Sequence, residues 1–343
     1  MESVTFDESK IDHLILIQSE KSFIKIHSLP TDPSILICTD THNFIKNFKR
    51  LAEQSQTIIL HCYPHTLEKT LCIAKDSLLK RCIWYTWGGD FSRTKNSTLS
   101  YVLRVLSRQK SLAEKFVQNI HGVACWNRSD LTLIKSIYRS KAKMYLAKYA
   151  GETEMNEAFN LNIKKPISPI RCLVGNNAKS TNNHLMLLES LSKFKDEDIE
   201  IYVPLSYPSG GQEYKNKVCE LGTRLFGSKF IPLTDYLEKL EYDKMLHTMS
   251  VGVFYQNRQQ GGYNMVQLLM SGAKLYLNPE SAPAKHFNET GTKTFSSLDI
   301  IGETFDSFVY LNEGIKYKNR DIIKYEYSLE YNDAHWFKII HRE

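Results

Sequence analysis

The residues with the clearest chemical potential lie in three short turns, each of which follows a predicted buried strand. The first turn is Trp87-Gly88-Gly89-Asp90, directly after the apolar run at residues 82–86. Its glycines let another group approach the backbone closely, and a carboxylate such as Asp90 can accept a proton as a general base. The alternative interpretation is a tight turn in which Asp90 caps a helix.

A second turn joins a predicted strand at residues 170–174 to a predicted helix at residues 181–194. It is rich in small residues and side-chain amides, and its candidate binding residues are Gly175, Asn176, Asn177, Ser180, Asn183 and His184. N–H groups at a helix N-terminus can hold phosphate, although neither the GxxxxGKS/T nor the GxGxxG pattern is present. The alternative is an ordinary polar turn with Thr181 as the N-cap and His184 as a structural histidine.

The third turn lies between a predicted strand at residues 251–255 and a predicted helix at residues 263–271. Its candidate binding residues are Arg258, Gln259, Gln260, Gly261, Gly262 and Asn264. Paired glycines at a helix start expose backbone amides to a diphosphate, the helix dipole attracts its charge, and a guanidinium can pair with it. A glycine turn without a ligand is again the alternative.

The composition is that of a globular protein long enough for two domains. The chain has 343 residues, of which 42% are hydrophobic and 24% are charged. No apolar run approaches the roughly 18 residues of a membrane-spanning helix, and the N-terminus lacks a signal-peptide pattern, so we expect a cytoplasmic protein. The seven cysteines include no CxxC pair, and the acidic run at residues 196–198 is interpreted as a solvated turn. No metal site is therefore predicted.

Positive charge is concentrated between Phe91 and Ala150. This segment holds twelve Lys and Arg against two acidic residues, a net charge of +10, whereas the whole chain carries +6. Such a segment indicates an anionic partner: nucleic acid, anionic lipid or a diphosphate. Nucleic acid is not favoured, because no aromatic-basic recognition motif is present. For an anionic membrane surface we expect Arg104, Arg108 and Lys110 among the contacts, with a solvated basic face as the alternative.

Short apolar runs alternate with segments of helical period along the chain, which predicts parallel sheets with helical crossovers and thus an α/β fold. The predicted strands are residues 14–17, 35–38, 57–61, 82–86, 122–126, 170–174, 199–204, 229–233, 251–255 and 274–277. The predicted helices are residues 42–53, 66–75, 97–116, 181–194, 212–226, 242–248 and 263–271. We expect domains at residues 1–150 and 170–325, a linker at 151–169, and a final helix at 326–343 that crosses back to the first domain.

Together these segments make the sequence similar to a known family, the bacterial TDP-N-acetylfucosamine:lipid II N-acetylfucosaminyltransferases. This is glycosyltransferase family 56, which takes part in enterobacterial common antigen synthesis. The matching stretches are Trp87-Gly88-Gly89-Asp90, Leu173-Val174-Gly175-Asn176 with Ser180, Asn182 and His184, Val203-Pro204 with Tyr207-Pro208, and Arg258-Gln259-Gln260-Gly261. The likeness runs from His61 to Trp336, and the combination of motifs is specific although none is specific alone.

The resemblance implies a GT-B-like fold, in which two Rossmann-like domains face a cleft and the second holds most of the nucleotide. It implies metal-independent transfer of a 4-acetamido-4,6-dideoxyhexose from a TDP-sugar to an undecaprenyl-diphosphate-linked saccharide. The nucleotide-sugar is a substrate, so no cofactor is expected. A lipid-linked acceptor would place the enzyme peripherally on the inner face of the bacterial inner membrane.

The resemblance also assigns roles to the turn residues. The second and third turns would bind the donor diphosphate, Tyr236 would flank the base and ribose, and Tyr207 is grouped with the donor-binding residues. Asp90 would activate the acceptor hydroxyl, and Trp87, Gly88 and Gly89 would shape its turn at the cleft.

One departure from the family concerns the start of the chain. The family fold opens with a strand, a turn and a helix before the strand predicted at residues 14–17, so we expect a shortened N-terminal domain. This expectation keeps two other functions open. One is a nucleotide-sugar epimerase of GT-B-like fold, and the other is a non-catalytic protein that binds nucleotide-sugar or lipid diphosphate.

Overall fold

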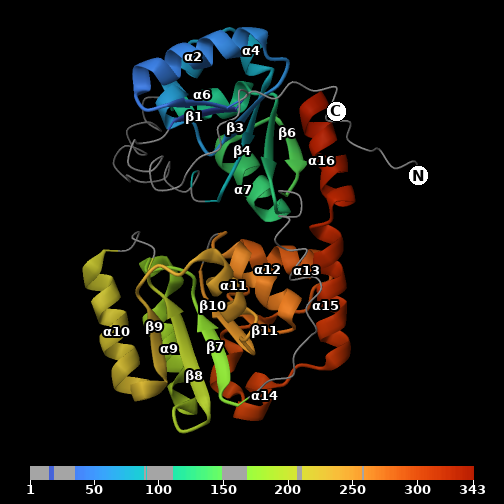
Figure 1. Ribbon diagram of the computed structural model, residues 1–343. Helices are drawn as coiled ribbons and strands as arrows, with labels where there is room; N and C mark the ends of the chain where they lie inside the picture. The colour runs from blue at the N-terminus through green and yellow to red at the C-terminus, as the bar shows by residue number, and fades with distance from the viewer. Residues whose placement is uncertain are drawn as a thin grey trace. The chain divides into compact units, whose positions relative to one another are not determined.

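The computed structural model describes residues 15–18, 35–88, 90, 111–148, 168–206, 211–256 and 259–343 (Figure 1). Contacts divide the chain into two units. Unit 1 comprises Met1–Lys148 with Asp333–Glu343, and unit 2 comprises Tyr149–Asn332. Within the described ranges, no helix is long and apolar enough to cross a membrane.

Unit 1 is an α/β unit built on parallel strands. Its elements, in chain order, are β1 (Ile15–Gln18), β2 (Ile35–Cys38), α2 (Thr41–Gln54), β3 (Ile58–His61), the 3-10 helix η2 (His65–Leu67), α3 (Glu68–Cys72), α4 (Asp76–Leu79), β4 (Cys82–Tyr85), α6 (Leu112–Asn119), β5 (Gly122–Cys125), α7 (Arg128–Tyr138) and β6 (Lys143–Leu146). The described strands form a sheet of order β3-β4-β5-β6 and a separate pair β1-β2. All of these pairings are parallel.

The central strands of unit 1 are apolar on both faces, as strands of a covered parallel sheet must be. Every residue of β4 and β5 is buried. Trp84 at the centre of β4 is fully buried and meets Tyr63 and Tyr138 edge to face. The strands therefore end at fixed positions, and the turns that follow them are held at one edge of the sheet.

Unit 2 contains a single six-stranded sheet. Its elements are β7 (Ile170–Val174), η4 (Ser180–Asn182), α9 (His184–Leu191), η5 (Ser192–Phe194), β8 (Ile199–Pro204), α10 (Gln212–Phe226), η6 (Gly227–Lys229), β9 (Phe230–Leu233), α11 (Lys239–Leu246), β10 (Val251–Phe254), α12 (Gly262–Ser271), β11 (Lys274–Leu277), α13 (Ala282–Thr290), β12 (Phe295–Ser296), η7 (Asp299–Gly302), α14 (Phe305–Val309) and α15 (Glu313–Glu326). The order of the strands is β12-β11-β10-β7-β8-β9, all parallel.

The two faces of this sheet are covered by different helices. Cys172 and Val174 of β7 pack in a core with α9, α10 and α14, whereas Leu173 between them packs in a second core with α12, α13 and α15. The first strand of the unit, β7, lies between β8 and β10, so the strand order reverses at this point. Ligands of open parallel sheets bind outside the carboxyl ends of the strands at such a reversal.

The α/β prediction is confirmed, and several predicted elements coincide with observed ones, including β2, β7, β8, β11 and α10. Several predicted helices differ from the observed ones, including the helix predicted at 242–248, which is observed as α11. The helix predicted at 66–75 is divided into η2 and α3, and of the helix predicted at 97–116 only residues from 111 onward are described, where α6 begins. The helix predicted at 181–194 begins at His184, because Asn183 has a left-handed backbone with φ 54°. Thr181 is therefore not its N-cap.

The C-terminal helix α16 (Leu329–His341) begins in unit 2 and ends in unit 1. Trp336 stacks on Tyr85 with a centroid distance of 5.6 Å, and its indole N–H donates to the Lys148 carbonyl at 2.6 Å. Thr57 donates its hydroxyl to the Ile340 carbonyl at 2.7 Å. The last turns of the helix are thus part of the fold of unit 1.

Candidate functional site

Gly175 directly follows β7, at the point where the strand order of unit 2 reverses. Its backbone N–H donates to the Val253 carbonyl at 3.0 Å, and its φ of +71° is favourable only for glycine. A Cβ atom there would lie 2.4 Å from Nε2 of His184. The chain can therefore turn sharply out of the sheet and pass over the His184 ring only because residue 175 has no side chain.

The loop after Gly175 is organised by one buried amide. Asn182 is fully buried, and its Oδ1 accepts the Asn176 N–H at 3.1 Å. Its Nδ2 donates to the carbonyls of Asn177 and Lys179 at 2.9 and 3.1 Å. Sequence reasoning gave Asn182 no role of its own, although its residue type in an amide-rich turn was the available signal. The hydrogen bonds of the Asn182 side chain therefore fix the shape of the loop between Gly175 and Asn182.

Gln260 joins the second loop to the first. Its Nε2 donates to Oδ1 of Asn176 at 2.9 Å, and its Oε1 accepts the Thr181 hydroxyl at 3.0 Å. Asn183 adds a hydrogen bond from its Nδ2 to the Tyr255 carbonyl at 2.8 Å. The structure thus brings the predicted residues of the second and third turns together across the β7–β10 reversal.

Helix α12 begins where these loops meet. Its N-cap, Gly261, has a φ of +72° and no side chain that could accept a bond from the first turn, and that turn contains no acidic residue. A Cβ on Gly261 would lie 3.0 Å from Cβ of Asn176. The N–H groups of Gly262, Tyr263 and Asn264 belong to this first turn, which has the donor set and dipole of an anion site.

Side chains beyond the first turn support this helix start. Asn264 is buried and donates from Nδ2 to the Tyr242 hydroxyl at 2.8 Å, which ties α12 to α11. The Tyr263 hydroxyl donates to Asp243 at 2.5 Å and accepts from Lys239 at 2.8 Å. Tyr236, predicted to flank the base, precedes α11 and is 73% exposed.

His184 lies beneath the loop rather than at its surface. The side chain is fully buried, and burial lowers its pKa to about 4, so the imidazole is neutral near pH 7. Its Nδ1 lies 3.3 Å from the Tyr214 hydroxyl, and its Nε2 has no hydrogen-bond partner among the described residues. A neutral ring packed against Gly175 positions the loop and supplies no positive charge to a phosphate.

A second group of polar residues lies at the carboxyl edge of the sheet in unit 1. Asp90 is 9% exposed, and it accepts the Trp84 indole N–H and the Trp87 backbone N–H, both at 3.1 Å. Gly88 has a φ of +72° and donates its N–H to Thr86. The turn thus folds back so that Asp90 is bonded to the end of its own strand, and Trp87 remains 47% exposed.

The environment of Asp90 makes its ionisation less favourable than that of an exposed aspartic acid. Burial raises the pKa of its carboxyl above the usual 3.8, and the hydrogen bonds from Trp84 and Trp87 lower it only partly. Asp130, at the start of α7, is a buried carboxyl whose pKa is raised first by burial and further by the charge of Asp90. Asn127 donates to Asp130 at 2.9 Å. Sequence reasoning did not identify Asp130, because it has the pattern of an ordinary first-turn residue.

Some predicted site residues lie outside the described ranges. These are Gly89, Arg104, Arg108, Lys110, Tyr207 and Arg258. Ser180, in η4, lies in the loop after β7, and Gln259 lies in the loop after β10; in the described part of the chain the buried Oε1 of Gln259 has no hydrogen-bond partner. Across the parts of the chain that are described, no three His, Cys, Asp or Glu side chains are grouped to hold a metal ion.

Comparison with known proteins identifies the family. Residues 16–303 match the family of 4-alpha-L-fucosyltransferases, glycosyl transferase group 56. The match covers most of the chain, and the protein belongs to this family.

Solved structures show the same fold. A glycosyltransferase from Rickettsia africae matches with a TM-score of 0.63 at 13% identity, over 94% of this chain and 88% of that one. A UDP-forming alpha,alpha-trehalose-phosphate synthase from Burkholderia xenovorans, in complex with glucose-6-phosphate, matches with a TM-score of 0.62 at 10% identity, over 88% of this chain and 76% of that one. Both have the GT-B fold, and the predictions of a GT-B-like fold and a glycosyltransferase are confirmed.

The close contact between the two loops leads to a prediction for Gly261→Ala. The new methyl group would press on Asn176, so we expect TDP binding to weaken about tenfold. Gly227→Ala is the matched control, because Gly227 also has a positive φ of +57° but a Cβ there meets nothing within 4 Å. Isothermal titration calorimetry with both variants measures the affinity. An unchanged TDP affinity in Gly261→Ala would show that the donor binds elsewhere.

Proposed function

We propose that this group 56 glycosyltransferase transfers a 4-acetamido-4,6-dideoxyhexose from a TDP-sugar to an undecaprenyl-diphosphate-linked saccharide in bacterial surface polysaccharide synthesis. The observation that carries the donor side is the pair of glycine turns at the strand reversal of unit 2. Gly175 turns the chain over the His184 ring, Gly261 leaves room for Asn176 of the neighbouring loop, and α12 begins directly after Gly261 without a side-chain cap. Such a site suits a diphosphate.

The donor diphosphate would be held mainly by neutral groups of this chain. The first-turn N–H groups of α12 would donate to its oxygens, with Arg258 as the pairing cation. Negative charge grows on the diphosphate as its bond to the anomeric carbon breaks, so fixed donors stabilise the transition state more than the bound sugar. The sugar is a substrate, and the proposed reaction uses no cofactor and no metal ion.

Asp90 would serve the acceptor. The acceptor hydroxyl oxygen forms the new bond to the anomeric carbon, its proton passes to the Asp90 carboxylate, and the nucleoside diphosphate leaves with the bonding electron pair. A carboxyl whose pKa is raised by burial holds a transferred proton better than an exposed one. The hydrogen bonds from Trp84 and Trp87 tie Asp90 to its own strand and turn, which fixes its position.

The basic segment between Phe91 and Ala150 supports a membrane location for the reaction. Each Lys or Arg near an anionic leaflet contributes about 1 kcal/mol within roughly a Debye length, so a few such residues suffice for reversible binding. We therefore place the enzyme in the cytoplasm, peripherally on the inner face of the inner membrane, with Arg104, Arg108 and Lys110 among the contacts. Nucleic acid is not a proposed partner.

A transfer assay tests this function. The purified chain is mixed with TDP-sugar and a polyprenyl-diphosphate-linked saccharide in vesicles, and mass spectrometry follows the lipid. We expect the lipid to gain one sugar for each TDP released, at a rate that rises with anionic lipid content and falls with added salt. Free or epimerised sugar formed without acceptor would favour an epimerase, and TDP-sugar binding without turnover would favour a binding protein.

Asp90 yields a separate prediction on pH dependence. Because a base must be ionised, the acid limb of kcat/KM should lie above pH 3.8, the usual pKa of an aspartic acid. In Trp84→Phe the ionised carboxylate of Asp90 loses a hydrogen bond, so its pKa rises and the acid limb moves to higher pH.

Asp90→Asn should lower kcat roughly 100-fold without changing TDP affinity, because the variant has no base to accept the proton.

Thermal melting provides the control for both variants. The Trp84→Phe comparison uses only protein that melts cooperatively, because Trp84 is fully buried and its loss leaves a cavity. A folded Asp90→Asn enzyme with nearly full activity would exclude Asp90 as the base.

A further inference from the structure

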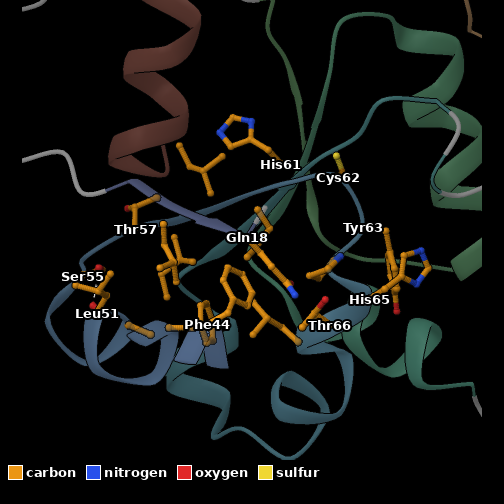
Figure 2. A pocket seen from close by; sticks show the side chains of 18 residues that line it. Gln18, Phe44, Leu51, Ser55, Thr57, His61, Cys62, Tyr63, His65 and Thr66 are labelled. Atoms are coloured by element: carbon orange, nitrogen blue, oxygen red, sulfur yellow. Dashed lines mark hydrogen bonds between the residues drawn. The ribbon is translucent and has the colours of Figure 1, made fainter. Parts of the chain in front are cut away.

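The cavity of unit 1 does not suit the charged part of a donor (Figure 2). It has a volume of about 430 Å³, and its walls come from β1, α2, β3 and the loop that follows β3. Phe44 and Phe48 of α2 and Leu60 of β3 are among the apolar side chains that line it, and no Lys or Arg of the described residues does. A diphosphate would lose its hydration there at a high cost. The anionic part of the donor is better matched by unit 2, where a lysine lies at the candidate donor site.

This lysine is Lys239, the first residue of α11. Its Nζ donates to the Tyr263 hydroxyl at 2.8 Å and lies 4.9 Å from the centroid of the Tyr263 ring. The same Nζ forms an ion pair with Asp243 at 2.8 Å. Because Tyr263 belongs to the first turn of α12, this positive charge lies close to the N–H groups that are proposed to bind the donor diphosphate.

Helices α11 and α12 lie side by side and run in the same direction (Figure 1). Near their starts, the Tyr242 hydroxyl accepts from Asn264 at 2.8 Å, and at the end of α11 His247 lies 3.0 Å from the Gln267 side chain. The two contacts follow in the same order along both helices, so the N-termini of α11 and α12 are adjacent. Helical side chains lean toward the N-terminus of their own helix. The Tyr263 hydroxyl therefore lies toward the end of α12 that an anion would approach.

The ion pair between Lys239 and Asp243 can open at little cost. The side chain of Lys239 is 45% exposed, and exposed pairs of this spacing contribute little to stability. Asp243 keeps a partner when the ammonium leaves, because its Oδ1 accepts the Tyr263 hydroxyl at 2.5 Å. A diphosphate carries more negative charge than one carboxylate. It can therefore compete with Asp243 for the ammonium of Lys239.

We propose that Lys239 binds a phosphate oxygen of the donor diphosphate, and that Asp243 and Tyr263 hold its ammonium beside the site until the diphosphate binds. This inference rests on the proposed donor site and adds a residue to it. On binding, the hydrogen bond from Lys239 to Asp243 is exchanged for one to the phosphate, while Tyr263 stays bonded to Asp243. An ammonium on a flexible four-carbon stem suits this exchange, because it binds phosphate as a point charge.

Isothermal titration calorimetry with TDP and with thymidine tests the phosphate contact. Lys239→Gln should weaken TDP binding about tenfold and leave thymidine binding unchanged, because thymidine has no phosphate. Lys239→Arg, which keeps the charge, should retain most of the TDP affinity. Lys244→Gln is the matched control, because it removes the same charge from an exposed position of the same helix. Both of its affinities should equal those of the wild type.

The double variant Lys239→Gln, Asp243→Asn separates this contact from a simpler role, in which Lys239 only neutralises Asp243. If Lys239 binds phosphate, the double variant should still bind TDP several-fold more weakly than the wild type. A return to wild-type affinity in the double variant would overturn the proposal. An unchanged TDP affinity in Lys239→Gln, or equal losses for TDP and thymidine, would overturn it as well.

Failure of the proposed function gives a different result. A wild-type chain that does not bind TDP would remove the donor site itself, and this proposal with it. Wild-type binding that is unaffected by Lys239→Gln would remove only the assignment of Lys239.

Discussion

The contact of Asn176 with Gly261 and with the Gln260 side chain is the constraint on which the candidate donor site depends. The loops that follow β7 and β10 meet there. They meet without a clash because residue 261 is a glycine, and Gln260 then bonds to Asn176 and Thr181 at the same time. Because α12 begins directly after Gly261, this contact fixes the position of its first turn. A change that pushes the loops apart would therefore displace the amides that are proposed to bind phosphate.

In the proposed reaction the two units have different electrostatic tasks: unit 2 stabilises negative charge on the leaving group, and unit 1 accepts a proton from the acceptor. In unit 2, the dipole and the first-turn N–H groups of α12 would stabilise the growing negative charge of the leaving diphosphate. In unit 1, burial keeps the proton affinity of Asp90 high, so the carboxyl suits the task of taking a proton from an acceptor. The neutral state of His184 fits this division, because the loop above it is shaped by packing and amides rather than by another charge.

Much of the fold could be predicted from the sequence because strands of a covered parallel sheet are predominantly apolar. β7, β8 and β11 each contain one charged residue in an otherwise largely apolar run, and they were predicted with their observed bounds. The helix α7 and the strand β6 were not predicted. α7 buries Leu131, Ile134 and Tyr138 at helical spacing, so its pattern was present in the sequence and was overlooked, whereas β6 is short and partly exposed. The C-terminal helices α13, α14 and α15 likewise have few apolar positions and are stabilised by packing against strands far away in the sequence.

The site was predictable in part for a similar physical reason. Glycines at strand ends indicate where the backbone must turn or be approached, so Gly175 and Gly261 could be identified from local sequence. The function of Thr181 depends on which loops become neighbours, and that follows from the strand order, whereas Asn182 bonds only within its own loop. Local sequence gave no indication that Asp90 is bonded to Trp84 of the preceding strand, or that the charge of Asp90 raises the pKa of a second buried carboxyl, Asp130.

The most direct measurement of the central claim is hydrogen–deuterium exchange of the purified chain with and without saturating TDP. If the diphosphate binds at the strand reversal of unit 2, exchange should slow at the amides of residues 175–184 and 259–265. The loops that follow β11 and α13 should change little. Protection confined to those loops or to unit 1, or no protection at saturating TDP, would contradict a donor site at this position.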